Sequence, residues 1–231
     1  MNGPGNVTST GVGYDNVILR PAYTGTTTVR SGLFRVGGSL ATGFNSYQYF
    51  QASSLNQGDY TVMIGATLTG MGTIGLASGG KVTLAGGKLI PGAGDYLGLG
   101  EDGGIGRSLH INGDLIVGDG ALCGANFLSP GSTIIDVNGL LDLRGAGDQL
   151  AMYGPINLEP AGSYVVMEYE NRLGSFDILP TTNGAHVTYT SGENSGPGQV
   201  IITIPEPTGA AFGAATLLVL LRRRHSSRVV R

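Results

Sequence analysis

The sequence is poor in cysteine, tryptophan, lysine and charged residues in general, and its composition excludes several classes of protein and site. Cys123 is the single cysteine, so neither an intramolecular disulfide nor a cysteine-rich metal site can form. We expect Cys123 to be a small buried hydrophobic residue. Tryptophan is absent, and lysine occurs only at Lys81 and Lys88. Charged residues make up 13% of the chain and hydrophobic residues 41%, which is too apolar for an intrinsically disordered protein.

Acidic residues are missing from the end of the sequence. All 16 of them lie at or before Glu206, whereas five of the 13 basic residues lie at or after Arg222. The chain up to Glu206 therefore carries eight basic and 16 acidic side chains, a net charge of −8, and the segment after it carries +5. An acidic body argues against a nucleic-acid interface, so we expect no nucleic-acid partner.

A signal peptide is not recognisable at the start, because residues 1–16 have neither a basic region nor an apolar one. We expect that the sequence begins inside a structural unit and that its repeats are incomplete at the N-terminal side.

Glycine, in contrast, is abundant, with 42 of 231 residues, but a Gly-x-y period is lacking, which excludes collagen. Between residues 65 and 92, glycines separate the short pieces Thr67–Thr69, Thr73–Leu76 and Val82–Leu84. A helix would lose about 1 kcal/mol at each glycine, whereas alternating Thr, Val, Ile and Leu suit short strands. Such strands must stack on similar strands to bury a face, which predicts an all-β solenoid.

Clearer alternation of apolar and polar residues follows in segments 109–117 and 135–143, which predicts one buried face for each. The expected buried positions are Leu109, Ile111, Leu115, Val117, Ile135, Val137, Leu141 and Leu143.

Segment 160–204 has fewer glycines and longer apolar patterns. We expect Val165, Met167 and Tyr169 to share one face of a strand, and Val200, Ile202 and Ile204 to share one face of the last strand. Further strands are expected at 175–179 and 186–189. A repeat array needs an atypical end to cover its open edge. We therefore predict solenoid repeats over 1–159 and a β-rich cap over 160–204.

Residues 17–43 contain an apolar triplet, Tyr23-Thr24-Gly25, a threonine-rich strand ending at Val29, a Ser31-Gly32 turn and another strand. This order resembles the autotransporter-associated β-strand repeat. Segments 70–75 and 89–92 resemble the later part of that repeat, although Arg20-Pro21 replaces its usual small polar residues. The resemblance implies a parallel β-helix or a related β-solenoid.

The last part of the sequence has three components in a fixed order. Pro205-Glu206-Pro207 is followed by the uncharged segment 208–221 and by Arg222, Arg223 and Arg224. As a helix, 208–221 would be about 21 Å long, which is shorter than a bilayer core of roughly 30 Å. A helix docked on the solenoid is the alternative, but the segment lacks a polar face that would suit docking.

Residues 205–231 resemble the PEP-CTERM sorting signal, with motif 205–207, a hydrophobic helix at 208–221 and a basic tail at 222–231. The resemblance implies recognition by an exosortase, which is a membrane transpeptidase, and a transient hold in the inner membrane through 208–221. It also implies cleavage near Pro205–Pro207. The implied destination is the cell surface or extracellular matrix of a Gram-negative-type bacterium.

Residues for catalysis are few, and we expect no catalytic, cofactor or metal site. The acidic pairs Asp136/Asp142 and Asp114/Asp119 have the spacing of solvated strand faces and Gly-Asp turns, not of a glycosidase dyad. Segment 103–109 nearly fits a glycine-rich calcium loop, but Ser108 stands where a carboxylate is needed. Other candidates for chemistry, all without a surrounding motif, are Arg107, Arg144, His110 and His186.

Sequence reasoning thus favours a non-enzymatic, exported structural or adhesion protein. The main alternative is a β-helix that binds or cleaves an extracellular polysaccharide, with tyrosines stacking on sugar rings; the candidates are Tyr47, Tyr49, Tyr96 and Tyr153. A third alternative is an autotransporter passenger, which is disfavoured because no outer-membrane barrel sequence follows.

Overall fold

The computed structural model describes most of the chain up to residue 206. The described residues are 2–3, 5–11, 16–18, 22–36, 38–43, 46–50, 52–53, 57–70, 72–91, 108–126, 134–153, 161–180, 184–191 and 197–206. Side chains are described in all of these ranges except 2–3, 16–18, 22–23, 38–43, 46–50 and 52–53.

The structure confirms an all-β fold, and the described residues contain no α-helix. The strands are β1 (Asn2–Gly3), β2 (Val7–Thr10), β3 (Asn16–Ile18), β4 (Ala22–Tyr23), β5 (Thr27–Val36), β6 (Gly38–Gly43), β7 (Ser46–Phe50), β8 (Ala52–Ser53), β9 (Tyr60–Met63), β10 (Ala66–Gly70), β11 (Gly72–Gly75), β12 (Lys81–Ala85), β13 (Lys88–Pro91), β14 (Leu109–Asn112), β15 (Asp114–Val117), β16 (Leu122–Asn126), β17 (Ile135–Leu143), β18 (Gln149–Tyr153), β19 (Gly162–Gly174), β20 (His186–Tyr189) and β21 (Gly198–Ile204).

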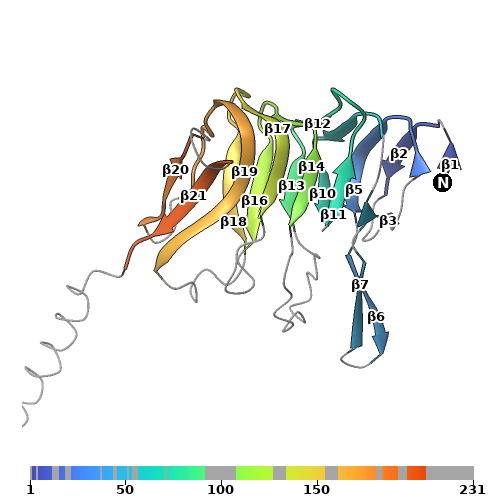
Figure 1. Ribbon diagram of the computed structural model, residues 1–231, viewed down its shortest axis with the longest axis horizontal. Helices are drawn as coiled ribbons and strands as arrows, with labels where there is room; N and C mark the ends of the chain where they lie inside the picture. Colours follow the sequence, from blue (N-terminus) through green and yellow to red (C-terminus); the bar gives the residue numbers. More distant parts are fainter. Residues whose placement is uncertain are drawn as a thin grey trace, which may run out of the picture.

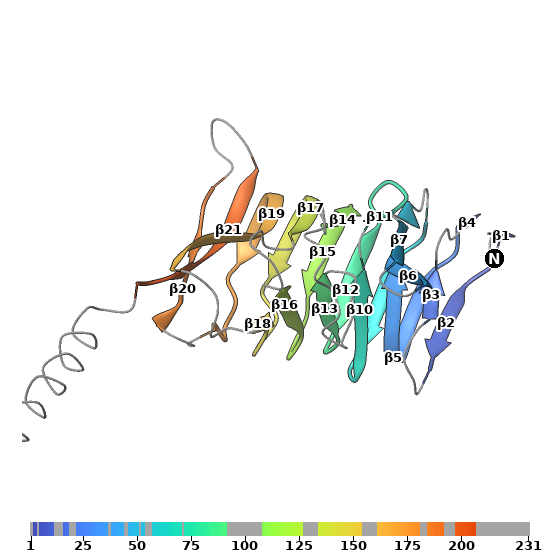
Figure 2. The ribbon, with the colours of Figure 1, turned by 90° about the horizontal axis from the view of Figure 1, so that it is seen from below.

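Most of these strands pair in parallel and form three ladders. Ladder 1 runs β8–β11–β14–β17–β19, ladder 2 runs β2–β5–β9–β12–β15–β17–β19, and ladder 3 runs β3–β5–β10–β13–β16–β18. Three long strands each take part in two ladders: β5 belongs to ladders 2 and 3, and β17 and β19 belong to ladders 1 and 2. The result is one curled 17-stranded sheet, with β2 near one end and β21 near the other (Figures 1 and 2).

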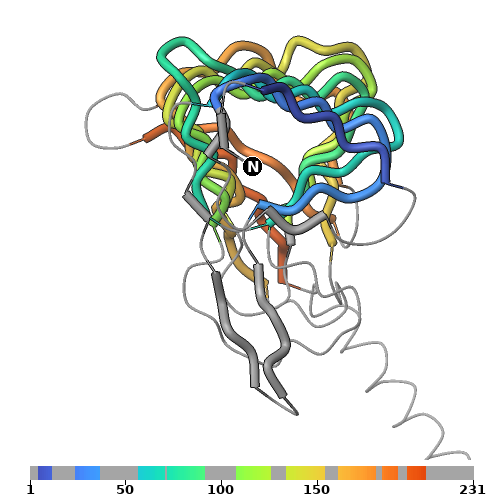
Figure 3. The backbone as a smooth tube through the Cα atoms, turned by 90° about the vertical axis from the view of Figure 1, so that its right-hand side faces the viewer, coloured from blue at the N-terminus to red at the C-terminus, as the bar shows by residue number. Residues whose placement is uncertain are grey.

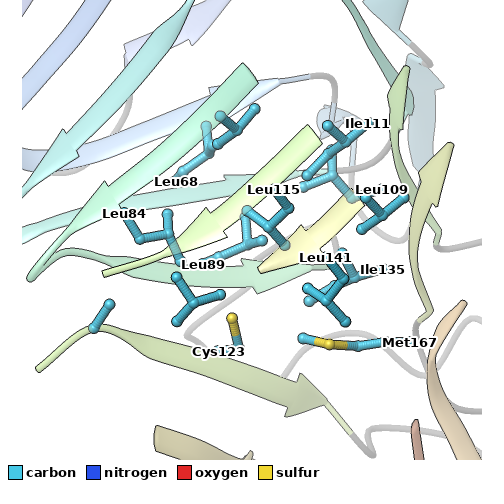
Figure 4. Close-up of a cluster of buried hydrophobic side chains, with 14 of the residues drawn as sticks. Leu68, Leu84, Leu89, Leu109, Ile111, Leu115, Cys123, Ile135, Leu141 and Met167 are labelled. Carbon is cyan, nitrogen blue, oxygen red and sulfur yellow. The ribbon is translucent and has the colours of Figure 1, made fainter. Parts of the chain in front are cut away.

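Side chains that point inward from the ladders form one continuous core. In the end-on view, the successive passes of the chain superimpose around a common interior (Figure 3). All eight positions predicted to be buried in 109–117 and 135–143 have at most 2% of their surface exposed. Leu109, Leu115, Ile135 and Leu141 pack in this interior together with Cys123 (Figure 4), which is buried as predicted. Each large side chain of this kind contributes roughly 1.5–3 kcal/mol by leaving water.

Glycine is needed where one pass of the chain crosses the next without room for a side chain. A methyl group placed on Gly145 would lie 2.5 Å from the carbonyl oxygen of Val117 and 2.5 Å from the carbonyl carbon of Gly118. Both are backbone atoms of the preceding corner, so neither can rotate away. The high glycine content is therefore explained in part by close stacking at the corners.

The pairing changes from parallel to antiparallel at the end of the sheet. Strand β21 pairs with β19 on one side and β20 on the other, both antiparallel. Val200, Ile202 and Ile204 are buried on one face of β21, as predicted.

Two details of segment 160–204 differ from the sequence prediction. In β19 the buried residues are Val166, Met167 and Tyr169, and Val165 is half-buried, because a register shift between Val165 and Met167 interrupts the alternation. Residues 175–179 are not a strand, since only Ile178 forms an isolated bridge, to Gln149. The hydrophobic helix expected at 208–221 lies outside the described residues.

Candidate functional site

The end of the last strand is the first candidate site, because the predicted sorting motif begins there. Ile204 is 5% exposed and is paired with Gly162 across β19. Pro205 and Glu206 follow directly, are exposed, and belong to no strand. Proline has no N–H to donate to a ladder and so ends the strand. The regular sheet therefore stops one residue before the motif begins.

The remainder of the predicted signal cannot be placed. Pro207, segment 208–221 and the three arginines Arg222, Arg223 and Arg224 lie outside the described residues. Within the described part of the chain, no helix is long and apolar enough to cross a bilayer.

The acidic pair Asp136/Asp142 is not brought together as a catalytic dyad. Both residues lie on β17, but Asp136 pairs in register with His110 and Glu168 in ladder 1, whereas Asp142 pairs with Ile116 in ladder 2. A register shift between Val137 and Leu140 separates the two halves of the strand.

The carboxylate of Asp142 instead forms an ion pair with Arg144. The Nε and Nη2 atoms of Arg144 donate to its two carboxylate oxygens over 2.8 and 2.7 Å. These hydrogen bonds hold the pKa of Asp142 below its usual value. The bidentate geometry gives the pair a fixed orientation. Arg144, which we considered as a catalytic base, is thus held by a carboxylate and has a pKa above its usual value.

The pair Asp114/Asp119 also has a structural use. Asp114 Oδ1 accepts the backbone N–H of Leu140 (2.9 Å), and Asp119 Oδ1 accepts that of Ala146 (2.8 Å). Each carboxylate therefore holds the corner of the following pass of the chain.

The same arrangement recurs at five corners, and sequence analysis did not find it. In each case an Asn or Asp that follows a glycine accepts a backbone N–H from the next pass, and we call this arrangement a Gly-Asx clasp. The five clasps are Asn6 to Thr26 (2.9 Å), Asp59 to Lys81 (3.0 Å), Asp114 to Leu140 (2.9 Å), Asp119 to Ala146 (2.8 Å) and Asp148 to Asp177 (2.8 Å). The Gly-Asn and Gly-Asp dipeptides are the signal that could have revealed them.

A second candidate surface is a set of polar side chains on the outer face of ladder 1 and of the adjoining strand β21, which we call the polar face. Its members are His110, Asn112, Asp136, Asn138, Glu168 and Gln199. Three hydrogen bonds link them in pairs across neighbouring strands: His110 with Asp136 (2.8 Å), Asn138 with Asn112 (3.0 Å) and Gln199 with Glu168 (2.9 Å). The side chains of His110 and Asp136 are 49% and 37% exposed, so this surface is accessible to a ligand.

The other candidate residues do not add to either surface. His186 is exposed at the start of β20, and Arg107 lies outside the described residues. Of the four tyrosines proposed for sugar stacking, only Tyr153 has a described side chain; its ring lies over Gly124, where an added methyl group would be 2.7 Å from Cε2. The Cδ2–Cε2 side of the Tyr153 ring therefore packs against Gly124.

Metal and cofactor sites were not expected, and the described residues contain no group of three or more His, Cys, Asp or Glu side chains that could hold a metal ion. Most of the near-calcium segment 103–109 lies outside these residues. The comparison with protein-family models gave no match to this chain, and the search of curated proteins gave none either.

Proposed function

We propose that this chain is a β-solenoid that serves as a non-enzymatic structural or adhesion protein at the cell surface or in the extracellular matrix. Residues 205–231 act as a PEP-CTERM-like sorting signal that an exosortase recognises and removes. In this proposal the outer surface of the solenoid carries the structural or adhesive role, and the sorting signal determines where the protein is located.

The three parallel ladders support the solenoid. Each strand of a ladder lies on its counterpart from the preceding pass, as Leu109 lies beside Ile135 and Leu68 beside Leu89. Such stacking buries a continuous interior that no single pass could bury alone. The antiparallel strands β20 and β21 then act as the cap of the last pass, which suits an array whose open edge must be protected.

The single observation that carries the sorting proposal is the junction at Ile204. Pairing ends at a buried residue, and the next two residues, Pro205 and Glu206, are exposed to solvent. A processing enzyme needs an extended, accessible segment outside the folded body. Cleavage near this position would leave all three ladders and their core intact.

The carboxylates considered for catalysis already have hydrogen-bond or ion-pair partners within the protein, which supports a structural role over a catalytic one. Asp114 and Asp119 are acceptors in clasps, Asp142 is paired with Arg144, and Asp136 is bonded to His110. A glycosidase instead keeps two carboxyl groups facing one another across the scissile bond.

Intact-mass measurement in a Gram-negative-type host that contains an exosortase tests the proposal. We expect the surface-extracted chain to end near Pro205–Pro207 and to lack Arg222–Arg231. Glu206→Gln and deletion of Arg222–Arg224 should each leave uncleaved, membrane-held protein, whereas the matched control Glu170→Gln, on an exposed position of β19, should be processed normally. A mature chain that still ends at Arg231 would refute the sorting proposal.

A second candidate function, polysaccharide binding, is favoured by the polar face alone. Its amide, imidazole and carboxylate groups are suited to hydrogen-bonding sugar hydroxyls. Affinity electrophoresis in gels that contain pectin, alginate, xylan or β-glucan tests it: retardation should be lost in Asn138→Ala but kept in the control His186→Ala. Equal mobility in all gels, with and without polysaccharide, would reject this candidate.

A further inference from the structure

The loop that follows β19 is fastened to the start of β18 by four hydrogen bonds. Asp177 donates its N–H to Asp148 Oδ1 (2.8 Å), and Gly147 donates its N–H to Asp177 Oδ2 (2.6 Å). Ile178 donates to the carbonyl oxygen of Asp148 (3.0 Å), and Leu150 donates to that of Ile178 (2.9 Å). We call this set the terminal clasp. It joins the strand β19, which carries the antiparallel end of the sheet, to ladder 3.

The side chain of Asp148 differs from those of the other four clasps because it is completely buried. Its exposed fraction is 0%, and its Oδ2 atom has no hydrogen-bond partner among the described residues. An ionised carboxylate in such a place is costly, since one oxygen has lost water and gained nothing in return. In the other four clasps, the amide of Asn6 and the carboxylate of Asp119 are exposed, and the carboxylates of Asp59 and Asp114 are half-buried.

Charge around Asp148 adds to this cost. Asp177, at the other side of the clasp, is a second carboxylate. The charge of Asp148 also acts on the thiol of Cys123 on β16 and on the phenol of Tyr189 on β20. Arg172 of β19, a cation that acts on Tyr189, lies over the Tyr189 ring, 4.4 Å from its centroid, and donates to Tyr169 and to the carbonyl of Gly174. Neither clasp carboxylate forms an ion pair within the described part of the chain.

We propose that Asp148 is a proton-binding site that tightens the terminal clasp in mildly acidic solution. The proton adds to the orphaned Oδ2 atom, the carboxylate becomes a neutral carboxylic acid, and Oδ1 keeps its hydrogen bond from Asp177 N–H. Protonation removes both the buried charge and its repulsion by the Asp177 carboxylate. This inference does not depend on the proposed export or sorting.

The direction of the pH effect follows from the two states. Burial, and then the negative charge of Asp177, raise the pKa of Asp148 above its ordinary value, while the hydrogen bond from Asp177 N–H partly offsets them. The folded chain therefore takes up the proton at a higher pH than the unfolded chain does. The contribution of Asp148 to stability should therefore rise as the pH falls through its folded pKa and level off below the unfolded value, near 4.

Hydrogen exchange of the full chain between pH 4.5 and 8, expressed as protection factors, measures the effect directly. Peptides covering 175–180 and 198–204 should become more protected as the pH falls. One proton limits the gain to at most about tenfold per pH unit. Asp148→Asn keeps the Oδ1 acceptor without the charge, so its protection should exceed that of the wild type at pH 7 and should not change with pH.

Asp119→Asn is the matched control, because it makes the same change in a clasp that is exposed. It should keep the wild-type pH dependence. If Asp148→Asn does not fold, Asp177→Asn serves instead: removing the like charge should move the wild-type rise to lower pH. The proposal is overturned if Asp148→Asn retains the full pH dependence, if protection falls on acidification, or if Ca²⁺ at pH 7 reproduces the stabilisation, which would assign the orphaned oxygen to a cation.

Discussion

The close crossing at Gly145 allows a stability change to be calculated from the structure. Gly145→Ala places a methyl group 2.5 Å from Val117 O and Gly118 C and 2.7 Å from Gly118 O. An unstrained methyl–backbone contact is about 3.5–4.0 Å, so the two corners must separate by about 1 Å. The nearby hydrogen bonds from Gly120 N–H to Ala146 O (2.9 Å) and from Ala146 N–H to Asp119 (2.8 Å) would stretch beyond their useful range.

These contributions set the expected magnitude. Overpacking in a rigid site costs about 1–3 kcal/mol, and each weakened hydrogen bond costs about 1 kcal/mol. The alanine also restricts the unfolded chain, which returns about 0.4–1 kcal/mol. We therefore expect Gly145→Ala to lower the free energy of unfolding by about 2–4.5 kcal/mol. Urea denaturation followed by far-ultraviolet circular dichroism measures this, as a lower midpoint with an unchanged slope.

Two control variants separate the causes. Gly5→Ala meets no atom within 4 Å and should be neutral or slightly stabilising. Gly147→Ala, in the same corner, also has open space, but its φ of +69° disfavours alanine, so it should lose about 1 kcal/mol. If Gly145→Ala were as stable as the wild type, or no worse than Gly5→Ala, the close stacking of corners would not explain the need for glycine.

Three further predictions follow from the core and the charged pairs. Ile111→Ala, at a position with 0% exposure, should lower the free energy of unfolding by about 2–5 kcal/mol in the same urea assay. Cys123 should not react with a thiol reagent such as 5,5′-dithiobis(2-nitrobenzoate) until the protein unfolds, because burial raises the pKa of its thiol and blocks access; rapid labelling of the native protein would contradict this. Arg144→Met should lower the urea midpoint only slightly at pH 7, since the Arg144 side chain is 64% exposed and water screens its pair with Asp142. Because the Arg144 hydrogen bonds lower the pKa of Asp142 in the folded state, this contribution should be present above the unfolded pKa of about 3.9 and should disappear as the pH falls through the folded pKa. Variant and wild type should therefore have equal stability once Asp142 is protonated in both.

The strands that alternate apolar and polar residues were predictable because the signal is local. Leu109, Ile111, Ile135 and Val137 are buried as their spacing indicated. The same rule misplaced Val165, because a bulge depends on how β19 meets β21 and not on the residues of β19 themselves. The prediction of a strand at 175–179 was wrong for a similar reason. Gly174 has a φ of +78° and ends β19, and Asp177, which follows it, forms hydrogen bonds of the terminal clasp in place of a strand ladder.

The all-β class, the buried faces of the regular strands and the end of the last strand at Pro205 could be predicted from local sequence, since each depends on residues within a few positions of one another. Which Asn or Asp side chain accepts from which backbone N–H depends instead on how the passes of the chain stack on one another. The clasp partners are 20 residues apart for Asn6, 22 for Asp59, 26 for Asp114 and 29 for Asp148, because each pass of the chain uses a different length of loop. Because the spacing between clasp partners is not constant, the partners cannot be predicted from the sequence. The burial of Asp148 and the missing hydrogen bond at its Oδ2 atom are therefore seen only in the folded structure.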